Sequence, residues 1–274
     1  ACRSAKDGCV LVVCGSSGDG RADPELSTSV SCSAAVRVVS YLRIIEGGHF
    51  ECLAVENQPG ARVFISDLLA PVSINCGIAH VSWFGSTEMR HVVQAVNAVE
   101  ASTGRSWGAL VDLDGGSYVQ ASGQLSVVVS SRDNLTIRNG RMIAIAGSPD
   151  LVTVYGSGFC LDRVHFRAYA SFAYALVTLD TAGEISKAKD RSGFTITNCS
   201  FDIGGGVGIR IGGNRPEFVT SRVLVSDCRF THESSSCNPF SIPASTGADG
   251  VVFRGCQFAN LHRSEWFLYG KNVS

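Results

Sequence analysis

The sequence has few lysines and no long run of basic residues. Only four of its 23 basic residues are lysine, and 24 acidic residues bring the formal net charge to -1. Proteins that bind nucleic acid neutralise many phosphates, so this distribution argues against nucleic acid as a partner. The chain also lacks a run of about eighteen apolar residues, which argues against a membrane-spanning helix.

No Cys-x-x-Cys pair is present, and this absence disfavours a closed zinc site. The chain has eleven cysteines, an odd number. Six of them fall in the first part of the chain: Cys2, Cys9, Cys14, Cys32, Cys52 and Cys76. They either pair in an oxidising compartment or remain free thiols that pack as small apolar side chains. We expect no metal and no cofactor.

An initiating methionine and a signal region of basic and then apolar residues are also missing, since the chain opens Ala1-Cys2-Arg3-Ser4. A removed leader or cleavage from a longer chain produces such a start. We therefore expect the mature fragment of a larger precursor.

One eight-residue pattern occurs five times: apolar, any, apolar, any, turn residue, small residue, any, then Phe or Met. The copies occupy residues 135–142, 159–166, 194–201, 223–230 and 251–258. The alternation with period two predicts a strand, and the Asn, Asp or Gly that most copies have at the fifth position predicts a bend in the left-handed region. Each copy is thus predicted to be a strand, a corner and a second strand.

A single unit of this kind cannot bury its apolar face, but units stacked at one strand spacing of about 4.8 Å bury it continuously. We therefore predict an all-β fold, a right-handed, single-stranded parallel β-helix with three strands per coil, from about Leu135 to the C-terminus. Stacking predicts an inner column of Cys199, Cys228 and Cys256 and another of Phe166, Phe201, Phe230 and Phe258. The third strands are expected near residues 151–154, 175–179, 207–211, 240–242 and 267–269.

A helix is predicted ahead of the repeats. Thr87-Glu88 begins a segment that ends at Thr103-Gly104 and has apolar residues on one face: Met89, Val92, Val93, Val96 and Val99. After it, residues 108–118 read as a short strand, a Gly-containing turn and Tyr118. The alternative is an ordinary amphipathic helix before an unrelated strand.

The helix, the strand after it and the repeats together resemble the pectin lyase-like β-helix superfamily. This family includes polysaccharide lyases, glycoside hydrolases and spike proteins of phages and viruses. The resemblance covers roughly residues 86–274 and implies that the helix at 87–103 caps the first coil. Residues 1–85 are β-rich but lack the pattern, so we expect there a smaller element that docks on the β-helix or on a partner.

In that family, sugars bind on the face formed by the strands that follow each repeat. The outward residues expected there are Thr153, Tyr155, Thr178, Asp180, Arg210 and Ser241. Asp180 and Arg210 are the candidates for catalysis, with a surface salt bridge as the alternative. Tyr155, Thr178, Asp180, Arg210, Ser241 and Tyr269 are the candidates for ligand binding, and Tyr169 and Trp266 are further aromatic candidates for sugar contact.

The acids needed to cut a polysaccharide are missing from this face. A glycosidase needs two carboxylates that flank the scissile bond, and only Asp180 appears there. The family's Gly-His-Gly, Asp-Asp and Asn-Thr-Asp motifs are also missing from these strands. Asp112 and Asp114 lie two apart and are expected to share one face, where calcium binding and acid–base work are the alternatives to plain solvated carboxylates.

We therefore expect a non-enzymatic structural protein of a virus or phage particle, either a surface protrusion or an attachment spike. Its partners would be other virion or capsid subunits in a symmetric oligomer, with a polysaccharide or glycan as a second candidate partner. Its place would be the virion surface or the extracellular space. The alternatives are a polysaccharide lyase or glycosidase with an atypical site, and a carbohydrate-binding β-helix without activity.

Overall fold

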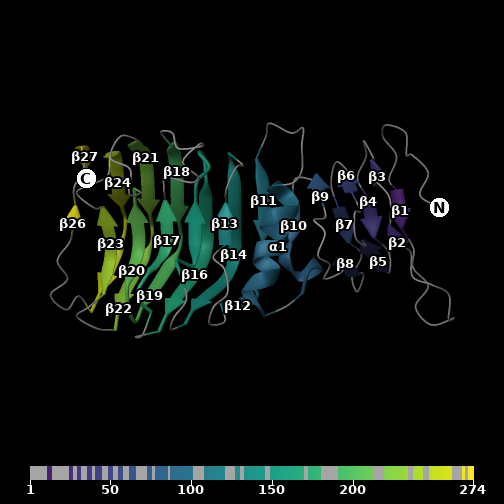
Figure 1. Cartoon of the computed structure of the whole chain (residues 1–274), viewed down its shortest axis with the longest axis horizontal. Helices are drawn as coiled ribbons and strands as arrows, with labels where there is room; N and C mark the ends of the chain where they lie inside the picture. Colours follow the sequence, from purple (N-terminus) through teal and green to yellow (C-terminus); the bar gives the residue numbers. More distant parts are fainter. Residues whose placement is uncertain are drawn as a thin grey trace.

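The structure of the chain is a computed structural model, shown in Figure 1. It describes residues 11–13, 25–26, 30–31, 36–38, 41–44, 49–51, 55–57, 62–65, 73–75, 78–85, 87–100, 108–120, 127–129, 133–145, 149–169, 172–179, 191–212, 219–233, 237–242, 247–260, 267–268 and 271–274. Within these residues the fold is mostly β, with one α-helix. All of their paired strands run parallel.

The repeats form one sheet of twelve strands and one of six. The main path of the larger sheet is β10 (Ile78–His80), β11 (Ala109–Asp112), β14 (Leu135–Ala144), β16 (Cys160–Ala168), β18 (Arg191–Thr197), β21 (Val219–Ser226), β24 (Gly247–Arg254) and β27 (Lys271–Val273). Beside that path lie β12 (Ser117–Val119), β19 (Ser200–Ile203), β22 (Arg229–His232) and β25 (Gln257–Ala259). The smaller sheet is β13 (Val127–Val129), β15 (Val152–Val154), β17 (Ala175–Leu179), β20 (Val207–Ile211), β23 (Asn238–Ile242) and β26 (Phe267–Leu268). Five of these six strands are those predicted after the repeats.

The corner of each repeat adopts the predicted left-handed conformation. The fifth positions have φ values of 62° at Asn139, 53° at Arg163, 54° at Asn198, 53° at Asp227 and 65° at Gly255. Asn, Asp and Gly tolerate this region well, whereas Arg163 adopts it although its side chain has no special preference for it. The neighbouring corners therefore impose the conformation on Arg163 through the shared register.

The two predicted columns are present, and their members are buried except for Cys256 and Phe258, which are half-buried. Ring centroids are 4.9 Å apart for Phe166 and Phe201, 4.8 Å for Phe201 and Phe230, and 5.2 Å for Phe230 and Phe258. These spacings match the separation of neighbouring strands, about 4.8 Å. In the cysteine column, the residues that follow Cys199, Cys228 and Cys256 pair in register on neighbouring strands. The backbone N–H of Arg229 donates to the carbonyl oxygen of Cys199, and that of Gln257 donates to the carbonyl oxygen of Cys228.

The predicted helix is α1 (Met89–Glu100), preceded by the 3-10 turn η1 (Val81–Trp83). Met89, Val92, Val96 and Val99 are buried as expected, and Val93 packs at the edge of the core. The helix contacts β9 (Ser73–Asn75) as well as β10, β11 and β13, so it lies between two sets of strands (Figure 1). Within the described residues, no helix is long and apolar enough to cross a membrane.

The N-terminal strands follow a repeating order that the sequence pattern did not reveal. They form three sheets of three strands: β1 (Leu11–Val13) with β4 (Val36–Val38) and β7 (Val55–Asn57), β2 (Glu25–Leu26) with β5 (Tyr41–Ile44) and β8 (Arg62–Ile65), and β3 (Val30–Ser31) with β6 (His49–Glu51) and β9. Each of the strands β1 to β6 pairs with the strand three places later. The chain thus visits these three sheets in rotation, whereas in the repeats it passes between the twelve-stranded sheet, where a corner divides each repeat, and the six-stranded sheet.

Candidate functional site

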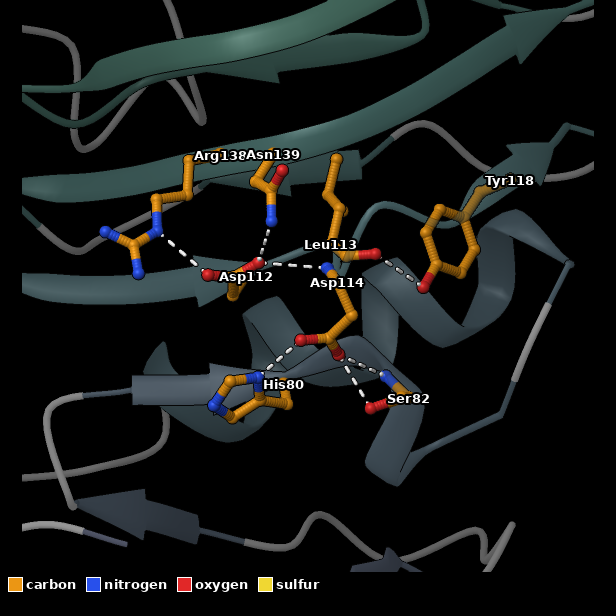
Figure 2. Close-up of polar contacts among 8 residues, drawn as sticks. All are labelled: His80, Ser82, Asp112, Leu113, Asp114, Tyr118, Arg138 and Asn139. Carbon is orange, nitrogen blue, oxygen red and sulfur yellow. Dashed lines mark hydrogen bonds and ion pairs between the residues drawn. The ribbon is translucent and has the colours of Figure 1, made fainter. Parts of the chain in front are cut away.

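Polar side chains converge on the turn that follows β11, close to where η1 leads into α1. Figure 2 shows Asp112 at the end of β11 and Asp114 in the turn. We expected both carboxylates on one face, but they point to different partners. The strand ends at Asp112 and the backbone of Asp114 is left-handed, with φ 54°, so the alternation of a strand does not continue between them.

Asp112 is buried, with 5% of its surface exposed, and is not the solvated carboxylate that we expected. Its Oδ2 accepts a hydrogen bond of 2.8 Å from Nε of Arg138 on the neighbouring strand β14. Its Oδ1 accepts from the backbone N–H of Asp114 at 2.9 Å and from Nδ2 of Asn139 at 3.2 Å. The carboxylate therefore joins β11, the turn and the corner of the first repeat.

Asp114 connects the same turn to the segment before α1. Its Oδ2 accepts from the backbone N–H of Ser82 at 3.1 Å and from Oγ of Ser82 at 2.6 Å. Its Oδ1 lies 2.5 Å from Nδ1 of His80, and both side chains are about one quarter exposed, at 26% and 28%. Burial alone would raise the pKa of Asp114, but the hydrogen bonds from His80 and Ser82 outweigh it and lower the pKa below 3.8.

Tyr118 covers the inner side of the turn. Its hydroxyl donates to the carbonyl oxygen of Leu113 at 3.1 Å, and the residue is almost completely buried. Burial, together with the negative charges of Asp114 and Asp112, raises the pKa of Tyr118 to about 12. The phenol therefore stays protonated and keeps its donor role at physiological pH.

This arrangement fastens three segments rather than presenting two acids to one substrate. Each of the four carboxylate oxygens faces at least one donor or imidazole nitrogen from the chain. The donors come from β10, η1, β14 and the turn itself. We name the seven polar residues the entry joint: His80, Ser82, Asp112, Asp114, Tyr118, Arg138 and Asn139.

The lowered pKa of Asp114 predicts a loss of stability in acid. Its folded-state pKa lies below its ordinary value, so its stabilising effect is complete above that value and disappears as pH falls through the folded-state pKa. We expect the free energy of unfolding to fall between about pH 5 and about pH 3, and Asp114→Asn to flatten this part of the curve. Urea unfolding at stepped pH measures the difference. An equal acid slope in the two proteins would contradict the role of Asp114.

The sequence pointed to Asp112 and Asp114 but not to their partners. His80 and Ser82 lie 34 and 32 residues before Asp114, in a stretch without the repeat pattern. Only the pairing of β10 with β11 brings them to the turn, because it places His80 opposite Asp112. The repeat pattern could have predicted Arg138 as a partner, since this residue precedes the first corner and pairs with Asp112.

The face predicted to bind sugar is only partly exposed. Register places Thr153, Thr178, Arg210 and Ser241 in one column of the six-stranded sheet. Arg210 is exposed and Ser241 is half-buried, whereas Thr153 and Thr178 are only 7% and 3% exposed. The hydroxyl of Thr178 donates to Oδ2 of Asp150 at 2.8 Å, so it serves the protein rather than facing solvent.

Two of the predicted residues, Asp180 and Tyr269, lie outside the described residues, as does Trp266. Tyr155 is half-buried, and its backbone N–H donates to the carbonyl oxygen of Val129. Tyr169 is 45% exposed, with the guanidinium of Arg167 5.3 Å from its ring centroid. The pairing of Asp180 with Arg210 therefore stays a prediction.

In the part of the chain that the structure describes, no three His, Cys, Asp or Glu side chains are grouped to hold a metal ion. Comparison with protein-family models, with curated proteins and with solved structures finds no match to this chain.

Proposed function

We propose that the chain is a right-handed parallel β-helix of the pectin lyase-like type and serves as a rigid structural protein. In each repeat, two strand segments joined by a left-handed corner are followed by a strand of the six-stranded sheet, and this three-part turn of parallel strands supports the β-helix. The right hand follows from the strong preference for right-handed crossovers between parallel strands. The N-terminal strands β1–β9 also rotate through three parallel sheets, so the β-helix would begin well before the helix α1.

The observation that carries the structural role is the elongated stack. Figure 1 shows the strands arranged along one axis, with β1 near one end and β26 and β27 at the other. Buried columns of phenylalanine and cysteine run along this axis and resist bending, because neighbouring side chains interlock at close-packed density. A stiff rod with a long lateral surface suits a protrusion or spike on a virus or phage particle, where identical copies assemble symmetrically.

The geometry favours this role over cleavage of polysaccharide chains. The carboxylates of the entry joint are held by hydrogen bonds within the protein. Thr153 and Thr178 are buried, so the predicted sugar face exposes fewer polar groups to a ligand. A second candidate is carbohydrate binding without cleavage. It is favoured by the exposed Arg210, which lies beside Ser241 in register.

The structural role is tested by where the native protein is found. Material from the source of the sequence is separated on a density gradient, and an antibody against the chain locates it. We expect the protein to sediment with nuclease-resistant particles and to be labelled on their surface. Recovery only as free protein would overturn the assignment to a particle.

Cleavage is tested separately on pectin, alginate and host glycans. We expect the purified chain to release no unsaturated ends and no reducing ends. Turnover that disappears in Asp180→Ala would overturn the structural interpretation in favour of a lyase or glycosidase.

A further inference from the structure

The seventh positions of the repeats form an outward-facing column that none of the functions above uses. In register along the sheet, the column contains Arg141, His165, Ser200, Arg229 and Gln257. Each is followed by an inward Met or Phe, which is buried in the first four repeats and half-buried at Phe258, so strand alternation turns the seventh side chain outward. The column therefore places a histidine directly beside a serine on neighbouring strands.

His165 bridges a serine and a carboxylate. Its Nδ1 lies 2.6 Å from Oγ of Ser200, and its Nε2 lies 3.3 Å from Oδ2 of Asp202. Ser200 and Asp202 are two residues apart on β19, so they share the outward face. The side chains of His165 and Asp202 are 28% and 35% exposed, which leaves the group open to a ligand from solvent.

We propose that Ser200, His165 and Asp202 form a surface site that hydrolyses carboxylic esters, with Ser200 as nucleophile, His165 as general base and Asp202 as the positioning residue. Serine is a weak nucleophile until a base within hydrogen-bond distance takes its proton, and the base in turn needs a partner that fixes its tautomer. The pair of Ser200 Oγ and His165 Nδ1 meets the first requirement, and the pair of His165 Nε2 and Asp202 Oδ2 meets the second. The site lies on β16 and β19, which are not the strands that carry the entry joint or form the six-stranded sheet.

The chemistry balances within these residues and water. With its proton on Nε2, beside Asp202, His165 accepts the Ser200 hydroxyl proton at Nδ1 while Oγ attacks the ester carbonyl carbon. The tetrahedral intermediate collapses, the C–O bond to the alcohol breaks, and His165 returns its proton to the departing alkoxide. Water then gives a proton to His165 and attacks the acyl carbon. The bond between this carbon and Oγ breaks as His165 returns the proton to Oγ, which releases the carboxylic acid and restores Ser200.

The surrounding charge indicates the class of ester. Arg141 and Arg229 flank His165 and Ser200 in the column, and Arg167 lies in register with Asp202. All three arginines are exposed, and among the described residues of the two register columns that hold these side chains there is one carboxylate, that of Asp202. The local excess of positive charge favours an ester that carries a negative group, and guanidinium donors suit the oxyanion of the intermediate.

The state of His165 agrees with its role as a base. Burial lowers its pKa below 6.5, and the charges of Arg141 and Arg167 lower it further, while the charge of Asp202 opposes them. The imidazole is therefore neutral at pH 7 and able to accept a proton. We expect the acid limb of the rate profile below pH 6.5.

Two measurements on the full chain test the site. An alkyl fluorophosphonate should add once to the wild-type protein, at Ser200, as seen by intact and peptide mass spectrometry. The chain should also hydrolyse the monoanionic ester mono-4-nitrophenyl succinate faster than 4-nitrophenyl acetate, by about tenfold in kcat/KM, because the arginines attract the anion.

The variants separate catalysis from folding. Ser200→Ala should abolish labelling and, like His165→Gln, should lower the rate by at least about 100-fold. Ser117→Ala is the matched control, because Ser117 is an exposed serine in the same column, opposite Arg141, and should change neither result. Arg229→Ala should reduce the preference for the anionic ester, and thermal unfolding followed by circular dichroism confirms that each variant folds.

Asp202→Asn tests the positioning role through the pH dependence of the rate, which a purely structural role of Asp202 would leave unchanged. Removing the carboxylate charge removes the influence that raises the pKa of His165, so the acid limb should shift to lower pH. Absence of labelling in the folded wild-type protein would overturn the proposal. So would equal ester hydrolysis by the wild type and a folded Ser200→Ala variant.

Discussion

Replacing Phe230 with alanine should lower the free energy of unfolding by about 3–5 kcal/mol. Phe230 is completely buried and stacks between Phe201 and Phe258, with interplanar angles of 5° and 12°. It also meets Phe240 edge-on at 6.5 Å between centroids. Truncation removes all of these contacts and leaves a cavity, and parallel strands on both sides prevent the stack from closing around it.

Guanidinium unfolding followed by circular dichroism measures this change. Phe258→Ala is the matched control, because Phe258 occupies the same column but is only half-buried and has one stacked neighbour among the described residues. Its substitution should cost clearly less than that of Phe230. Equal losses at the two positions would mean that stacking within the column does not determine the stability.

Asp112→Ala should lower the free energy of unfolding by about 3 kcal/mol, near the lower end of the range for breaking a buried ion pair. The lower end applies because the guanidinium side chain of Arg138 is 36% exposed and regains water when its partner is lost. Asn139 and the backbone N–H of Asp114 lose their acceptor at the same time. The effect is therefore larger than that of one ordinary hydrogen bond.

Glu88→Ala is the control for this prediction, since Glu88 pairs with Arg90 at 2.8 Å but both side chains are about half exposed. An exposed pair of this kind contributes at most about 1 kcal/mol. Urea unfolding of both variants at pH 7 gives the comparison. A loss at Asp112 no larger than that at Glu88 would show that the entry joint does not hold the first strands together.

Much of the fold could be predicted because the stacked repeats carry their own register. Once the copies are aligned on the fifth position, the left-handed corners and the buried columns of Cys and Phe follow from strand alternation. The same alignment also holds a signal that we did not use. It sets the seventh positions opposite one another, which is enough to place His165 beside Ser200.

Other features could not be predicted because they depend on pairings without a repeated pattern. The N-terminal strands are two to four residues long, too short for alternation to define a register, yet they rotate through three sheets. The separation of Asp112 from Asp114 depends on one left-handed residue after the strand ends. The burial of Thr178 depends on a contact with Asp150, 28 residues earlier in the chain.

The amino-acid sequence by itself determined the strands, their corners, the amphipathic helix and the inner columns, because period-two alternation and turn residues act locally and repeat along the chain. Only the tertiary structure decided which polar groups meet. His80 reaches Asp114, and Asp202 reaches His165, through the registers of parallel strands that are 20 or more residues apart in the chain. Side-chain chemistry is short-ranged, so the site depends on these distant pairings rather than on neighbours in the sequence.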